Sequence, residues 1–270
     1  MADNSATTAS RIGLRVVALA YIGMILLLPV GVLFWRTFEN GVCEVWSQLT
    51  QPAAVHAFRV TLIVAFWAVL GNTIFGVGAS LLLVRHRFPG KRVFNALIDL
   101  PFAVSPVVVG LALILVYGPK ASTGGWLADR GIDVIFAVPG MIIATIFVSL
   151  PLVVREVVPV LEEIGEEQEQ AAWTLGASKL QTFRRITLPA IRWALAYGVV
   201  LTLARALGEY GAVAVVSGNV INKTQTAPLF VGSAYQNFNQ QGAYAVAFAL
   251  ALIAILALVL LNLLRPKEHT

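Results

Sequence analysis

The sequence predicts an all-helical membrane protein with about six membrane-spanning helices. Of its 270 residues, 58% are apolar and only 12% are charged, against about 25% charged in typical soluble domains. The mean hydropathy is +0.81. A membrane-spanning helix needs roughly 20 apolar residues, so six spans use close to half of the chain. We therefore expect a single membrane domain over residues 1–270, with no room for a separate catalytic domain.

The expected spans are the six longest apolar runs, and each element follows from its own stretch of sequence. They cover residues 16–35, 60–84, 93–117, 134–154, 193–216 and 243–264. The first run follows two arginines, as a secretory signal does, but it is about 20 residues long and has no small-residue cleavage site, so we expect an uncleaved span. Pro101 and Pro106 predict kinks in the third run, because proline removes a backbone donor from the helix.

The positions of Lys and Arg predict the orientation, because basic residues near span ends stay in the cytoplasm. With both termini inside, thirteen of the 19 basic residues fall in inner segments, five in outer loops and one, Arg205, within a span. Four of the thirteen lie within residues 85–92. Both termini are therefore predicted to be cytoplasmic, and the net charge of +5 is attributed to inner loops rather than to nucleic-acid binding.

The longest polar segment, residues 155–192, is predicted to form a helix, a glycine turn and a second helix in the cytoplasm. Glutamates within residues 162–169 suit the start of a helix, where the macrodipole favours negative charge, and Gly176 suits its end. Ser178 and Gln181 have the spacing of a capping box for the second helix, which we expect to stop at Pro189.

One face of the first of these helices carries small or polar residues at helical spacing: Gln168, Ala171, Ala172 and Leu175. Such a face suits insertion into a groove on another protein. The alternative is a loop that folds back on the membrane surface.

The run from Gln170 to Ala177, followed by Ile186, Leu188 and Pro189, resembles the EAA loop of ABC-importer permeases. In that family the loop forms a coupling helix that docks in a cleft of the ATP-hydrolysing subunit. The resemblance implies that the residues that contact the ATPase are Glu169, Gln170, Ala171, Ala172, Leu175, Gly176, Ala177, Ile186, Leu188 and Pro189. The leading Glu of the family motif is Gln170 here, which can donate a hydrogen bond but cannot form an ion pair.

Three further segments, residues 99–108, 189–195 and 204–213, resemble the W-type permease subunit of bacterial sulfate/thiosulfate importers, and the similarity covers about residues 16–264. The resemblance implies a type I importer bundle in the bacterial inner membrane. It also implies three kinds of partner: a second, T-type permease, two ATP-binding subunits, and an extracytoplasmic sulfate- or thiosulfate-binding protein. Molybdate and tungstate permeases carry close versions of residues 204–213 and remain an alternative.

This chain is not predicted to be an enzyme or to bind a cofactor. It lacks the phosphate-loop pattern G-x-x-x-x-G-K-[ST], so ATP and Mg²⁺ are expected on the partner ATPase subunits. An ion-coupled secondary transporter is a second alternative, but such proteins usually contain inverted repeats, and we find no internal repeat.

Ionisable residues within the spans are candidates for function, because charge is costly in the membrane interior. Arg205 and Glu209 are four residues apart and are predicted to share a helix face. They form either a structural ion pair or a site where Arg205 faces the path and attracts an anion. Asp99 and Ser105 are further candidates for a path or a structural role. For Asp99 the structural role would be to cap its helix or to pair with Arg92. The scattered histidines and the single Cys43 predict no metal site.

Overall fold

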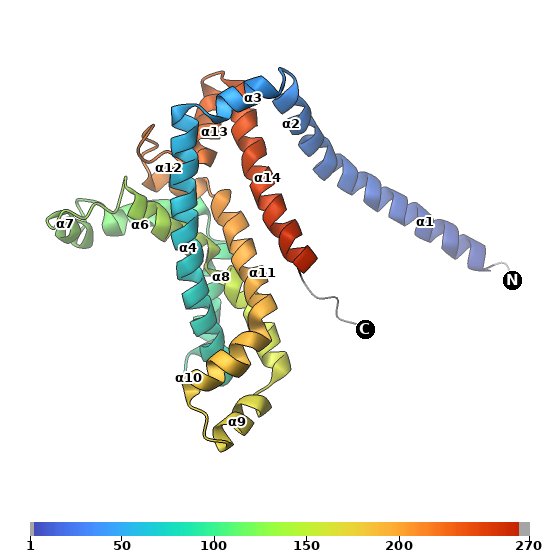
Figure 1. The fold of residues 1–270 in the computed structure, drawn as a ribbon, viewed down its shortest axis with the longest axis vertical. Coiled ribbons are helices and arrows are strands. Elements are labelled where there is room, and N and C mark those ends of the chain that lie inside the picture. Colours follow the sequence, from blue (N-terminus) through green and yellow to red (C-terminus); the bar gives the residue numbers. More distant parts are fainter. Residues whose placement is uncertain (1–2, 265–270) are drawn as a thin grey trace.

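The computed structural model describes residues 3–264, which contain helices and no β-strand. Five helices are long and apolar enough to cross a membrane, and two bent helices make a sixth candidate span. The predicted all-helical fold with about six spans is confirmed. Elements α9 and α10 lie at one end of the bundle, and α3 and α13 lie at the other (Figure 1). Arg265 and Lys267, which we counted as basic inner residues, lie outside the described residues.

The first half of the chain forms α1 (Asp3–Ile22), the π-helical turn η1 (Gly23–Leu27), α2 (Leu28–Phe38), α3 (Val42–Leu49), α4 (Pro52–Arg85), α5 (Lys91–Ala103), α6 (Pro106–Tyr117) and α7 (Ser122–Ala128). The second half forms α8 (Val138–Ile164), α9 (Glu167–Thr174), α10 (Lys179–Thr182), the π-helical turn η2 (Phe183–Thr187), α11 (Leu188–Leu207), α12 (Gly211–Val216), α13 (Ala227–Gln236) and α14 (Gln240–Leu264).

The centre of the bundle is the contact of α4, α8 and α11 around Val153. This side chain of α8 is fully buried, and glycines of the other two helices face it. A β-carbon on Gly76 of α4 would lie 2.6 Å from the Cβ of Val153, and one on Gly198 of α11 would lie 2.9 Å from its Cα. Glycine at both positions therefore allows the three backbones to approach closely.

The predicted third span is not one straight helix. Helices α5 and α6 meet at an angle of 111°. Val104 and Ser105 between them are extended, with ψ of 132° and 133°. The cause is Pro106, whose ring disfavours the helical conformation in the residue before it.

The predicted bounds of the fifth span, residues 193–216, are wrong at both ends. The helix already begins at Lys179 and runs without a break through Leu207, so the second loop helix does not stop at Pro189. The π-helical turn η2 precedes this proline, and the N–H of Leu188 donates to the carbonyl of Phe183. The wider turn makes room for the proline ring. The chain then breaks at Gly208 and resumes as α12.

The fourth span is also longer than predicted, because α8 continues beyond residue 154 to Ile164. Arg155 is therefore part of the helix rather than the start of the loop. The loop begins at Gly165, which adopts a positive φ of 64°.

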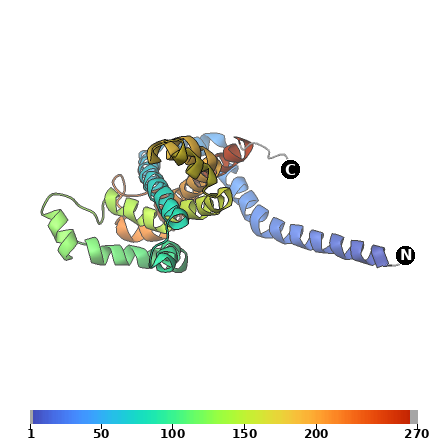
Figure 2. The ribbon, with the colours of Figure 1, turned by 90° about the horizontal axis from the view of Figure 1, so that it is seen from below.

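Most of the first span is set apart from the bundle, and only its end in α2 packs against α14. Its apolar stretch Gly13–Phe38 is 26 residues long, and no residue of its most apolar window is buried in this chain. Figures 1 and 2 show α1 projecting away from the other helices. Its side chains are thus available to lipid or to another membrane chain.

We expect Gly76→Ala to destabilise the bundle, because the new methyl group would meet the Cβ of Val153 at 2.6 Å. Overpacking of this kind costs about 1–3 kcal/mol. Thermal unfolding of the purified protein in detergent should show a lower Tm. Gly78→Ala is the matched control on the same helix, since nothing in the described part of the chain lies within 4 Å of its added β-carbon. Equal melting temperatures for the two variants would contradict the close contact.

Candidate functional site

The loop between α8 and α11 forms the predicted helix, glycine turn and helix. Helix α9 is followed by Gly176, which has a φ of +85°. The N–H of Gly176 donates to the carbonyl of Trp173 at 3.0 Å. The capping box is also present: Gln181 N–H donates to Ser178 Oγ at 3.3 Å, and Ser178 N–H donates to Gln181 Oε1 at 2.8 Å. The local sequence signals therefore fix the shape of the loop.

The outer surface of this loop carries most of the residues that the family motif singled out. Gln170 and Ala171 are exposed, and the Leu175 side chain is 88% exposed. A shallow hollow of about 460 Å³ lies between α9 and the start of the next helix; it is lined by Ala172, Leu175, Gly176, Ala177, Gln181, Thr182, Arg185 and Ile186. Leu188 and Pro189 lie outside this hollow, in the first turn of α11. We call the exposed residues Gln170, Ala171 and Leu175, together with the hollow, the loop face.

Glu169 does not belong to the loop face, because it points into the protein. Its Oε2 lies 3.1 Å from Nε of Arg85, and its Oε1 accepts from Arg85 Nη2 at 3.2 Å and from the hydroxyl of Thr187 at 2.8 Å. The two charged side chains are only 9% and 8% exposed. Glu169 is thus a buried anchor of α9.

Arg85 makes further bonds that tie the loop to the spans. Its Nη1 donates to the carbonyl of Leu161 at 3.1 Å and its Nη2 to the carbonyl of Gly165 at 2.7 Å. One guanidinium at the end of α4 therefore holds the end of α8 and, through Glu169, both α9 and η2. We call the contacts of Arg85, Glu169 and Thr187 the loop clamp. In the sequence Arg85 is only one of the basic residues that indicate orientation, and its position at the end of α4 does not by itself identify its partner.

Asp99 pairs with Arg155 and not with Arg92, so that expectation is wrong. Arg155 Nε donates to Asp99 Oδ1 at 2.8 Å, a second guanidinium nitrogen contacts Oδ2, and Nη2 donates to Asn95 Oδ1 at 3.3 Å. The pairing follows from the packing of α5 along α8. Asp99 lies in the second half of α5, away from the first turn that contains Arg92.

The pair Arg205 and Glu209 forms as predicted, but at the end of a helix rather than within one. Arg205 Nη1 lies 2.7 Å from Glu209 Oε2, with the side chains 39% and 2% exposed. Glu209 Oε1 also accepts from the N–H of Ala212 at 2.9 Å, and so caps the start of α12. The carboxylate is buried, while the guanidinium keeps a partly open side.

Two spans are broken: α5 bends into α6, and α11 breaks before α12. These two broken spans contact each other through small residues of α6 and α12. A β-carbon on Gly110 of α6 would lie 2.7 Å from the Cβ of Val215 in α12, and one on Gly211 would lie 3.0 Å from the Cβ of Pro106. Ser105, which is exposed at the start of α6, is thereby brought near the segment that follows Glu209. Two of the predicted path positions, distant in sequence, thus lie in one region of the bundle.

Among residues 3–264, no group of three or more His, Cys, Asp and Glu side chains could hold a metal ion. Cys43 is an exposed free thiol near the start of α3. The Nε2 atom of His56 is within hydrogen-bond distance, 3.3 Å, of the carbonyl oxygen of Lys223.

Residues 72–269 match the family of binding-protein-dependent transport system inner membrane components. The chain belongs to this family. Membership confirms the resemblance to importer permeases and decides against an ion-coupled secondary transporter.

Relatives within the permease family support the same assignment. The chain is 49% identical over 250 residues to the sulfate transport system permease protein CysW of Synechocystis sp., covering 93% of this chain and 91% of that protein. It is 39% identical over 250 residues to the sulfate transport system permease protein CysT of Salmonella typhimurium, covering 93% and 90%. The permease is thus more similar to this W-type relative than to this T-type one.

A solved structure confirms the fold. The permease matches a chain of a bacterial alginate ABC transporter, in complex with an alginate-pentasaccharide-bound periplasmic protein, with a TM-score of 0.79. The match covers 96% of this chain and 94% of that chain, at 16% sequence identity.

We expect Arg85→Gln to release α9, because it leaves the carboxylate of Glu169 buried without its cation. Loss of one partner of a buried ion pair costs about 3–5 kcal/mol. Hydrogen–deuterium exchange across residues 165–178 should become faster. Arg87→Gln, which removes an exposed charge two positions along, should leave this exchange unchanged.

A double variant tests whether the unpaired charge, rather than the loss of the arginine side chain, releases α9. Arg85→Met with Glu169→Met removes both charges, so exchange in α9 should lie closer to that of the unmodified protein than in Arg85→Gln alone. Unchanged exchange in Arg85→Gln would show that the ion pair does not hold the loop.

Proposed function

We propose that this permease is the W-type subunit of an ATP-driven importer of sulfate or thiosulfate, and that its loop face docks on an ATPase subunit. The observation that carries the proposal is the loop face itself: a surface with an 88% exposed leucine, small residues and a hollow, on a helix that the loop clamp fixes to three spans. A solvent-exposed apolar face on a rigid support is typical of a surface that another protein covers.

The transport direction requires such a partner. Moving a dianion inward against a potential of 100 mV costs about 4.6 kcal/mol, at about 2.3 kcal/mol per charge. The permease has no phosphate-loop motif, so ATP and Mg²⁺ belong to partner subunits, two of them by the family resemblance. Gln170 at the loop face can donate a hydrogen bond to such a subunit, although it provides no charge for an ion pair.

The proposed path runs along the region where the two broken spans meet. Backbone irregularity within a membrane is tolerated where it lines a cavity or is buried in protein. Here Arg205 offers a partly open guanidinium with five donors, while Glu209 holds it in place. The start of α6 at Ser105 adds the positive end of a helix dipole. Both features favour an anion over a cation. Asp99 and Arg155 neutralise each other, and we assign them a structural role.

The remaining partners are assigned from relatives. The names CysW and CysT of the two relatives support a second permease of the T type as a partner. This second permease would offer an apolar surface for α1 to contact. The periplasmic protein in the alginate importer complex supports delivery by an extracytoplasmic binding protein. The basic residues 85–92 lie at the same end of the bundle as α9 (Figure 1). By the positive-inside rule we propose that this end faces the cytoplasm, and the count of basic residues along the sequence supports the same side for both termini.

We expect Leu175→Asp to weaken association with the ATPase subunit by at least about thirtyfold, while the permease remains folded. A charge buried at the centre of an interface costs about 2 kcal/mol or more, roughly thirtyfold in affinity. Co-purification of the ATPase with the tagged permease measures the loss. Phe238→Asp is the matched control, because Phe238 is 89% exposed but lies between α13 and α14 at the opposite end (Figure 1). Retention of the ATPase by Leu175→Asp would exclude docking at the loop face.

We expect Arg205→Gln to abolish uptake of labelled sulfate in cells while the importer still assembles, because the path loses its fixed positive charge. The double variant Arg205→Gln with Glu209→Gln leaves no unpaired carboxylate, so it tests a structural role. If uptake returns in the double variant, the pair is structural and Arg205 is not a path residue.

The same uptake assay identifies the anion. Thiosulfate is expected to compete with labelled sulfate, since both are divalent oxyanions of the proposed substrate class. Stronger competition by molybdate than by thiosulfate would support the molybdate or tungstate alternative.

A further inference from the structure

We propose that a cavity between the start of α5 and the end of α8 binds the phosphate of an anionic phospholipid headgroup. The cavity measures about 900 Å³ and shares no lining residue with the loop face or with the contact between α6 and α12. Its chemistry is that of a tetrahedral oxyanion site with an apolar wall.

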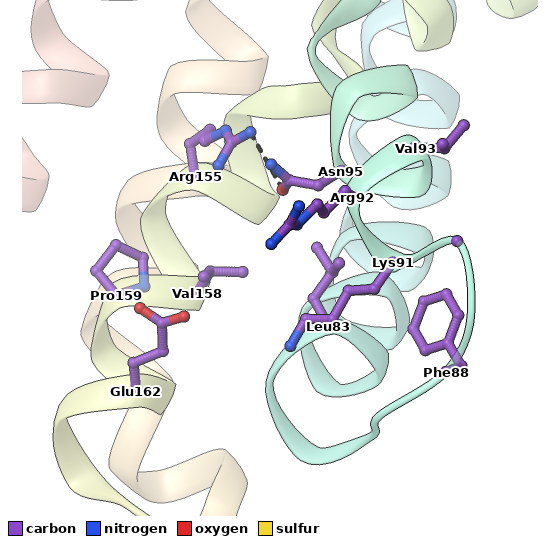
Figure 3. A pocket seen from close by; sticks show the side chains of 11 residues that line it. Leu83, Phe88, Lys91, Arg92, Val93, Asn95, Arg155, Val158, Pro159 and Glu162 are labelled. Atoms are coloured by element: carbon purple, nitrogen blue, oxygen red, sulfur yellow. Dashed lines mark hydrogen bonds between the residues drawn. The ribbon is translucent and has the colours of Figure 1, made fainter.

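Three basic side chains surround the cavity: Lys91 and Arg92 from α5, and Arg155 from α8 (Figure 3). Arg155 is neutralised by Asp99. Among the described residues, Lys91 and Arg92 form no ion pair with a carboxylate. Glu162 also lines the cavity, but it is exposed and makes no ion pair with any residue of the range 3–264. Two cationic groups therefore remain available to an anion.

The backbone at the start of α5 adds to the positive potential. Gly90 precedes the helix in a left-handed conformation, with a φ of +84° and no side-chain cap, and the first turn contains no acidic residue. Gly90 and the first three residues of α5 all line the cavity. The N–H groups of an uncapped helix start favour an anion, and here they lie beside the two available cations.

The rest of the lining favours a lipid over a free anion. Leu83, Phe88, Val93, Val158 and Pro159 form an apolar wall, and a free phosphate or sulfate gains nothing from apolar contact. Helix α4 ends at Arg85 and α5 begins at Lys91, so the cavity lies where membrane-spanning helices meet the headgroup layer. Basic pockets between membrane helices are typical sites for anionic headgroups.

The test uses the tagged chain, purified with the subunits that accompany it, and quantifies bound phosphatidylglycerol by mass spectrometry after exchange into phosphatidylcholine micelles. We expect Arg92→Gln to retain about fivefold less phosphatidylglycerol, since each basic side chain near an anionic lipid contributes about that factor. Lys91→Gln should act similarly. Arg87→Gln removes the same charge from the same loop, but Arg87 does not line the cavity, so it should retain the lipid.

Two further arms separate the sources of the oxyanion. Phosphatidylglycerol vesicles should raise the Tm of the unmodified protein more than that of Arg92→Gln, whereas inorganic phosphate or sulfate alone should raise neither. Equal protection by the free anions would overturn the assignment to a lipid. Equal lipid retention by Arg92→Gln, Lys91→Gln and Arg87→Gln would overturn the site. Because lipid retention is measured without transport, the result is independent of the proposed importer function.

Discussion

The buried ion pair between Arg85 and Glu169 is the constraint on which the arrangement of the loop depends. Two charges taken from water are costly, and their attraction offsets that cost only when additional hydrogen bonds satisfy the remaining donors and acceptors. Here the Thr187 hydroxyl and the carbonyls of Leu161 and Gly165 supply those bonds. The same contacts connect the ends of α4 and α8 with α9 and η2. A force on the loop face therefore acts on several spans at once.

The two broken spans follow a second constraint, that membrane-embedded backbone must be satisfied within the protein. The break after α11 leaves the start of α12 in need of an acceptor, and the buried carboxylate of Glu209 supplies it. Its charge is in turn balanced by Arg205. Gly110 and Gly211 allow α6 and α12 to approach closely. An intramembrane ion pair and two irregular helices are thus parts of one arrangement.

The sequence predicted the helical class, the number of spans and the turn chemistry of the loop, because these depend on local composition and on capping residues such as Ser178. The prolines predicted a kink in the third run but not a bend of 111°. The break at Gly208 was not predicted, because an apolar run has the same composition whether its backbone is straight or bent. The predicted fourth span ended too early, because a charged residue such as Arg155 normally marks the start of a loop. Its partner Asp99 lies on another helix, and the local sequence does not reveal this pair. Long-range pairs, including Arg85 with Glu169, have no local signal.

The π-helical turn η2 explains how the loop and the proposed path are mechanically joined. A proline at position 189 in a regular helix would kink or end it, and the loop would then connect to the span through a flexible joint. The widened turn instead keeps residues 179–207 as one helix. From Thr187 in the loop clamp to Arg205 this helix rises about 27 Å, at about 1.5 Å per residue. A displacement of the clamp is thus carried by a continuous helix to Arg205, which pairs with Glu209 at the break before α12.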